Sequence, residues 1–241
     1  MSNAQGMTEN FGAGWTLAMK MDGADTTNFK YDSALWTNDK GLHENSANMQ
    51  RTGYKHPEVY SMMEFDEILI GMDGMLDGTV RWVKLDVAST SLQDLFANTA
   101  TNTFLSRPTK EEWIWSMNDP NADIQPHCNA NGINIAQGSS RARFGIISNQ
   151  ENNCGSCDSR IGVGGWGHPR NNIVVGNTRH WVHSLFCFSF DCESAQTRTH
   201  TITDARREQR RSIFICLHVC KIGWRCHDKQ KQLALDQRSS T

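Results

Sequence analysis

The sequence of 241 residues lacks a long apolar run and a strong charge of either sign. Its longest apolar candidate, Ser212 to Cys220, is far shorter than the roughly 20 residues that a membrane helix needs. A formal net charge of −2 and a pI of about 6.5 argue against a domain devoted to nucleic-acid binding. Residues 1–8 have neither the basic nor the apolar segment of a signal peptide, and we interpret them as a leader or a truncated start.

Catalytic motifs are missing as well. There is no Gly-x-Ser-x-Gly, no phosphate-binding loop and no His-Glu-x-x-His. The glycines at 162, 164 and 165 lack the preceding strand, the following helix and the distant acid of a dinucleotide site. We therefore expect a protein that is not an enzyme.

The residues that are present change in character near Gly176-Asn177. Residues 1–179 carry 14 basic and 20 acidic side chains, together with 18 of the 19 glycines and all 5 prolines. Residues 180–241 carry 10 basic and 6 acidic side chains and 5 of the 8 cysteines. Because a compact domain needs turn-forming residues, we predict one domain over 9–179. We predict that 180–241 is a divergent basic, Cys-containing tail and not a domain.

Local patterns within 9–179 predict an α+β fold. Large and small residues alternate from Gly14 to Met21, as in a half-buried strand. Leu92, Leu95 and Phe96 have helical spacing after a Ser/Thr cap. Strands are predicted over 14–21, 65–72, 79–85, 133–135 and 142–148, a helix between 89 and 104, and a loop over 149–177.

Three segments carry a resemblance to a family. Gly14-Trp15-Thr16-Leu17 resembles the opening strand of fibrinogen C-terminal-like domains, and Leu35-Trp36-Thr37-Asn38 resembles a later segment of them. The stretch 140–167 resembles the ligand region of intelectins and of cnidarian lectin-like fibrinogen-related proteins. The resemblance implies a loop-rich calcium and ligand lobe at 149–177. The family's closing segment, whose aromatic strand returns to the central sheet, is not recognisable after Arg179.

The acidic calcium loop of fibrinogens and ficolins is absent, which leaves five oxygen-bearing side chains as the candidate calcium ligands: Asn149, Glu151, Asn152, Asn153 and Asp158. Carboxylates and amide carbonyls on flexible loops are ligands that Ca²⁺ prefers, independently of the family. The alternative is an Asn-rich turn whose side chains bond their own backbone. We expect Ca²⁺ as the cofactor, bound weakly.

Cys154-Gly-Ser-Cys157 allows three interpretations. A redox dithiol would stand at a helix start, and zinc would need His168, His180 or His183 at an unusual spacing. A disulfide in an extracellular domain is the ordinary interpretation. It makes Cys128 a natural partner for one of the two cysteines and leaves the third to a partner in the C-terminal segment.

Trp166 and His168 lie on a glycine-rich turn where the resemblance implies ligand contacts. An exposed aromatic side chain there would stack on a sugar ring, whereas a buried one would fill the small core of the lobe. Five other tryptophans beside the strands are expected in the core: Trp15, Trp36, Trp82, Trp113 and Trp115.

The expected function is that of a secreted, non-enzymatic recognition module. The resemblance implies calcium-assisted, lectin-like binding of glycans, and the alternative is a structural or adhesive protein of the extracellular matrix, including a mineral-associated matrix. Glycans or matrix components are the expected partners, without nucleic acid or a membrane span. For the tail there are three interpretations: an altered reading frame or an unspliced segment, a genuine basic appendage, or a resemblance that does not reflect homology.

Overall fold

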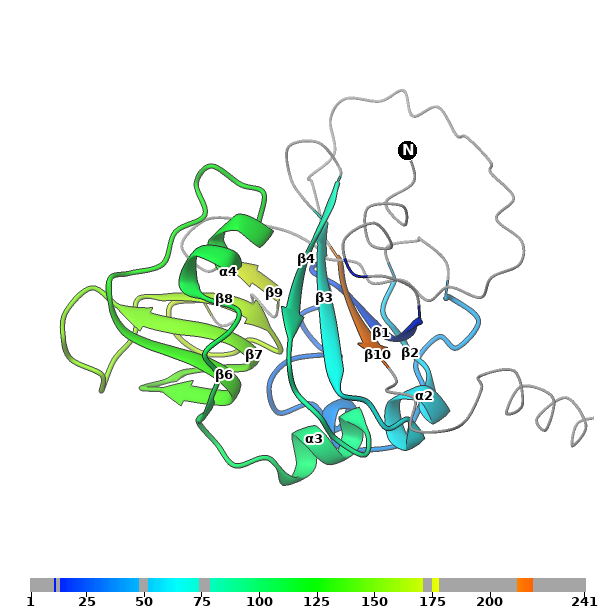
Figure 1. Ribbon diagram of the computed structural model, residues 1–241. Coiled ribbons are helices and arrows are strands. Elements are labelled where there is room, and N and C mark those ends of the chain that lie inside the picture. Colours follow the sequence, from blue (N-terminus) through cyan, green and yellow to red (C-terminus); the bar gives the residue numbers. More distant parts are fainter. Residues whose placement is uncertain are drawn as a thin grey trace, which may run out of the picture.

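The computed structural model in Figure 1 describes residues 11, 14–47, 52–73, 79–170, 175–177 and 212–218. The helices in this part are η1 (Ala34–Trp36), α2 (Pro57–Met62), α3 (Leu92–Asn98) and α4 (Lys110–Ser116). The strands are β1 (Trp15–Asp22), β2 (Tyr54–Lys55), β3 (Glu67–Asp73), β4 (Val80–Leu85), β5 (Thr103–Phe104), β6 (His127–Gln137), β7 (Ser140–Asn149), β8 (Ser159–Val163), β9 (Val175–Asn177) and β10 (Ser212–His218).

The strands form two antiparallel sheets of five. The first has the order β2-β1-β10-β3-β4 and the second the order β5-β6-β7-β8-β9. One hydrophobic cluster takes side chains from both sheets, among them Met19, Ile68, Phe144 and Ile161. Mixed strands with a few short helices confirm the predicted α+β class.

Short-range signals placed several elements correctly. Helix α3 begins after Ser91, whose hydroxyl accepts the backbone N–H of Asp94, as the cap had indicated. Helix α4 was not predicted, although Thr109 and Glu112 form a reciprocal capping box at its start. A cap alone therefore marks a helix less clearly than a cap followed by helical spacing of apolar residues.

Four of the five tryptophans assigned to the core are buried: Trp15, Trp36, Trp82 and Trp113. Trp36 is central, since its ring contacts Phe29 and Phe96 edge-to-face with centroids 5.8 and 4.8 Å away. The prediction for Trp115 is wrong, because its side chain is 52% exposed at the end of α4. Trp113 and Trp115 lie two residues apart on a helix and not on a strand, so they face different surroundings.

The predicted loop over 149–177 is partly wrong. Residues 159–163 form β8 and residues 175–177 form β9, both in the second sheet. The sequence of β8 hides its strand character, because Arg160 and Gly162 interrupt the apolar residues, yet all five residues of β8 are buried. Two apolar residues in a strand of five are too short a pattern to indicate a strand.

Seven residues of the predicted tail lie inside the fold. Strand β10 pairs with β1 on one side and with β3 on the other, and Figure 1 shows it in orange between them. The fold therefore includes residues beyond the expected domain boundary at 179. Amino-acid composition contains no information about pairing between strands that lie more than 130 residues apart in the sequence. The rest of 178–241 lies outside the described residues.

Candidate functional site

The turn that carries Trp166 is fastened to the β6–β7 hairpin. Trp166 and Arg141 exchange both backbone hydrogen bonds, with N···O distances of 2.9 and 3.0 Å. Gly167 has φ of +81°, and a Cβ there would lie 1.7 Å from the carbonyl oxygen of Ser139. Only glycine permits this close approach, so the backbone around Trp166 follows the hairpin closely.

Beneath the turn lies the buried guanidinium of Arg160, a residue of β8 that is 1% exposed. Its Nη1 donates to the carbonyl oxygens of Trp166 and His168 at 2.5 and 3.4 Å and to Ser140 Oγ at 2.9 Å. Its Nη2 donates to the carbonyl oxygen of Arg170 at 3.3 Å. The Arg160 side chain thus bonds to three backbone carbonyl groups of the turn over residues 166–170.

The charge of Arg160 persists despite its burial. Burial lowers the pKa of this guanidinium to about 10, so the group is still protonated at neutral pH. Charge-assisted bonds to carbonyl oxygens offset part of the desolvation cost. The neighbouring Cys157 thiol is also buried and donates to the carbonyl oxygen of His168 at 3.4 Å. Burial raises the pKa of Cys157, which keeps it a neutral thiol.

The surface around Trp166 combines aromatic rings and cations. Lys30 Nζ lies 5.2 Å from the centroid of the half-buried Trp166 ring. The guanidinium of the exposed Arg141 lies 5.8 Å from the Tyr31 ring, and that of Arg143 lies 4.4 Å from the same ring. Asp32 pairs with Lys30 at 3.7 Å, so one of these cations is partly neutralised. Rings and hydrogen-bond donors therefore adjoin on one surface.

His168 lies on the same turn with its side chain exposed. Its Nε2 is 3.9 Å from Asp158 Oδ1. The structure thus brings one residue assigned to the ligand site next to one assigned to calcium.

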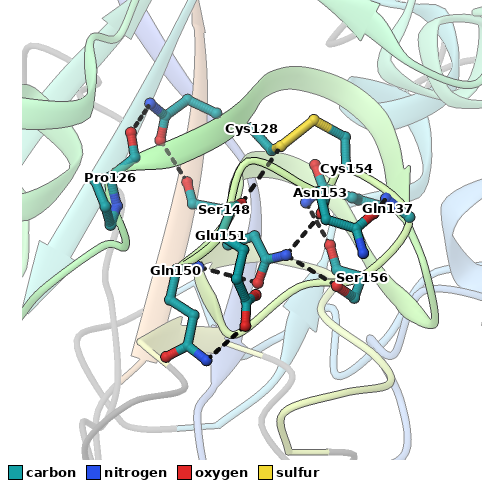
Figure 2. Close-up of a disulfide and its surroundings, with 12 residues drawn as sticks. Pro126, Cys128, Gln137, Ser148, Gln150, Glu151, Asn153, Cys154 and Ser156 are labelled. Carbon is teal, nitrogen blue, oxygen red and sulfur yellow. Dashed lines mark hydrogen bonds between the residues drawn. A yellow bond between two sulfur atoms is a disulfide. The ribbon is translucent and has the colours of Figure 1, made fainter.

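The polar loop, residues 150–158 between β7 and β8, makes hydrogen bonds largely within itself and with Asn149 (Figure 2). Asn149 is fully buried, its Nδ2 donates to the carbonyl oxygen of Asn153 and its Oδ1 accepts the N–H of Gln150. Asn153 Oδ1 accepts the N–H of Gly155. Two of the five expected calcium ligands thus use their amide oxygens in turn hydrogen bonds, in line with the alternative interpretation.

The remaining three expected calcium ligands are arranged differently. Asp158 Oδ2 accepts the N–H of Gln150 at 3.3 Å, and Glu151 Oε1 accepts from the Gln150 side chain at 3.0 Å. Asn152 is exposed. Within the described residues, no three His, Cys, Asp or Glu side chains are grouped as a metal site would require. The calcium assignment stays a prediction.

A disulfide joins Cys128 of β6 to Cys154 of the polar loop (Figure 2), with the two Cα atoms 5.3 Å apart. It closes the loop onto the sheet, next to Asn153 and Ser156. Cys157 carries a free, buried thiol and forms no disulfide with Cys128 or Cys154. Of the five cysteines after residue 179, Cys216 lies among the described residues, in β10, whereas the other four lie outside them, as do His180 and His183.

Sequence reasoning missed Arg160, Lys30, Tyr31 and Arg141 as parts of this site. An arginine inside an otherwise apolar, glycine-flanked segment was the available signal for Arg160, because a buried charge in a strand needs several partners. Nothing in the sequence places Lys30 or Tyr31 beside Trp166, more than 130 residues later.

Comparisons with known proteins give no match to a family model, a curated protein or a solved structure. No helix among the described residues is long and apolar enough to cross a membrane.

Proposed function

We propose that this chain is a secreted, non-enzymatic recognition module that binds carbohydrate at the Trp166 turn. One observation carries the proposal: the half-buried Trp166 lies on a turn whose carbonyl groups are held by a buried arginine. A turn that is already ordered loses little conformational entropy when a ligand binds. An accessible indole stacks on the apolar face of a sugar ring.

The surrounding side chains suit hydroxylated ligands. Lys30 is a donor beside the Trp166 ring and Arg141 is a donor beside the Tyr31 ring, and neither belongs to the buried core. Rigid aromatic rings with a few polar groups are typical of small-ligand sites. The Cys128–Cys154 disulfide supports placement in an oxidising, extracellular compartment.

We further propose a fibrinogen-related domain, with Ca²⁺ as its cofactor. Two features support the family. The opening strand that resembles it forms β1, and β10 returns from the C-terminal segment to the middle of the same sheet. A C-terminal strand that returns to the sheet is what the resemblance implies.

We expect Trp166→Ala to abolish glycan binding, with signals on a glycan array at least about tenfold below those of the unchanged chain. Phe104→Ala is the matched control, because Phe104 is an aromatic residue 63% exposed in β5. Both variants are first checked for an unchanged near-UV circular dichroism spectrum. Glycan signals that survive Trp166→Ala, or that vanish equally in Phe104→Ala, would contradict the proposed site.

We expect Ca²⁺ to bind the polar loop with a dissociation constant on the order of 10⁻⁴ to 10⁻³ M, the range of extracellular modules. Asp158→Ala should remove this binding, since it deletes one of two carboxylates in the loop, and should weaken glycan binding through His168. Asp86→Ala, at an exposed carboxylate of another segment, should change neither. The measurement is calorimetric titration of Ca²⁺, followed by the array with and without chelator. Absence of calcium heat at millimolar concentration would refute the cation site, and equal glycan binding in chelator would refute its coupling to the ligand.

A further inference from the structure

A second aromatic surface lies at the junction of α4 and β4. A pocket of about 290 Å³ is lined there by Arg81, Ile114, Trp115, Asn118, Asp119 and Pro120. Trp115 is 52% exposed. A tryptophan this accessible leaves a large apolar ring in contact with water. The cost of that exposure is relieved when a ligand covers the ring.

Arg81 is held against this tryptophan. Its Nη1 donates to the carbonyl oxygen of Trp115 at 2.8 Å, and its Cζ lies 5.0 Å from the centroid of the Trp115 ring. Among the described residues, no carboxylate comes within ion-pair distance of Arg81. A guanidinium has five N–H donors, so a pre-oriented cation offers its remaining donors at the edge of the pocket.

We infer that this pocket binds a pyranose ring that carries one carboxylate, that is, a uronic acid. The carboxylate would bond to the Arg81 guanidinium, which matches its planar geometry. The apolar face of the ring would cover the indole of Trp115, beside Pro120 and Ile114. A pocket of this volume lies at the small end of the range for ligand sites, about 300–1,000 Å³, and suits a single sugar.

Charge limits the ligand to one negative group. Asp119 also lines the pocket, and its Oδ1 accepts the N–H of Asn121 at 2.9 Å. Its carboxylate opposes a multiply charged phosphate or sulfate cluster more strongly than a single carboxylate, because the repulsion grows with the charge of the ligand. One cation with one nearby acceptor therefore favours a hydroxylated monocarboxylate.

The test is titration of the full chain with glucuronic acid, followed by NMR of the indole N–H signals. The Trp115 signal is assigned from its loss in Trp115→Phe. We expect a saturable shift of this signal with a dissociation constant on the order of 1 mM, and no shift with methyl glucoside. Arg81→Lys keeps the charge but removes the planar fork, and should weaken binding about tenfold.

Controls separate this site from the Trp166 turn. Trp166→Ala and Phe104→Ala should leave the glucuronic acid titration unchanged, whereas Trp115→Ala should abolish the heat of binding measured by calorimetry. If Trp115→Ala does not fold, Arg81→Lys decides the question alone. Equal binding of methyl glucoside, no saturable shift with glucuronic acid, or unchanged binding in Arg81→Lys would overturn the inference. Loss of glycan binding at Trp166 would not affect it.

Discussion

A chain that ends at residue 179 is expected to lose the cooperative unfolding transition of the full chain. The truncation removes β10, which pairs with β1 over Trp15–Asp22 and with β3 over Glu67–Met72. Its removal from the middle of the sheet leaves two facing rows of backbone N–H and C=O groups without partners. The loss is expected to exceed the 5–15 kcal/mol by which domains of this kind are stable.

The experiment compares the full chain with chains that end at residue 179 and at residue 220, by urea unfolding and near-UV circular dichroism. The chain that ends at 220 keeps β10 and is the matched control. It should unfold at nearly the same urea concentration as the full chain. A cooperative, unshifted transition in the chain that ends at 179 would show that β10 is dispensable and would restore the domain boundary inferred from composition.

Gly145→Ala is expected to lower the free energy of unfolding by more than about 3 kcal/mol. Glycines stand opposite one another across four strands of the second sheet, in the pairs Gly132–Gly145, Gly145–Gly162 and Gly162–Gly176. At Gly145 φ is +155°, and a Cβ would lie 2.2 Å from the carbonyl oxygen of Ile161. The neighbouring backbone would have to move, because no flexible side chain can yield at this place.

Gly155→Ala is the matched control for this substitution. A Cβ there would first meet the side-chain oxygen of Asn153, at 3.2 Å, which can rotate away. A change within about 1 kcal/mol is therefore expected. Urea unfolding of both variants measures the difference. If Gly145→Ala is no less stable than Gly155→Ala, the close approach of β7 and β8 at this row is incorrect.

The sequence predicted best those elements whose signals are local. The alternation from Gly14 to Met21 became β1, and the cap at Ser91 with apolar residues at helical spacing became α3. Strands 65–72 and 79–85 were found for the same reason and lie within one or two residues of β3 and β4. The spacing of neighbouring side chains therefore predicts such elements, although β1 proves to be buried on both faces and not half-buried.

The features that the sequence analysis did not predict depend on contacts with distant segments of the chain. Strand β8 is buried on both faces, and a charged residue and a glycine within only five residues did not indicate a strand. Trp115 was assigned to the core because it was taken to lie within or beside a strand, whereas it lies on α4 with its side chain exposed. The row of glycines is spread over four separate segments, and its members become neighbours only through strand register.

The sequence by itself determined the α+β class, the local limits of several strands, and the presence of an aromatic residue on a glycine-rich turn. It also pointed to Cys128 as a partner of the Cys154/Cys157 motif, and the disulfide joins Cys128 to Cys154. The tertiary structure alone decided that Arg160 supports the turn, that Lys30 lies over Trp166, and that β10 belongs to the first sheet. Each of these contacts joins residues from distant segments of the chain. Local composition does not show which distant segments meet when the chain between them closes into a loop.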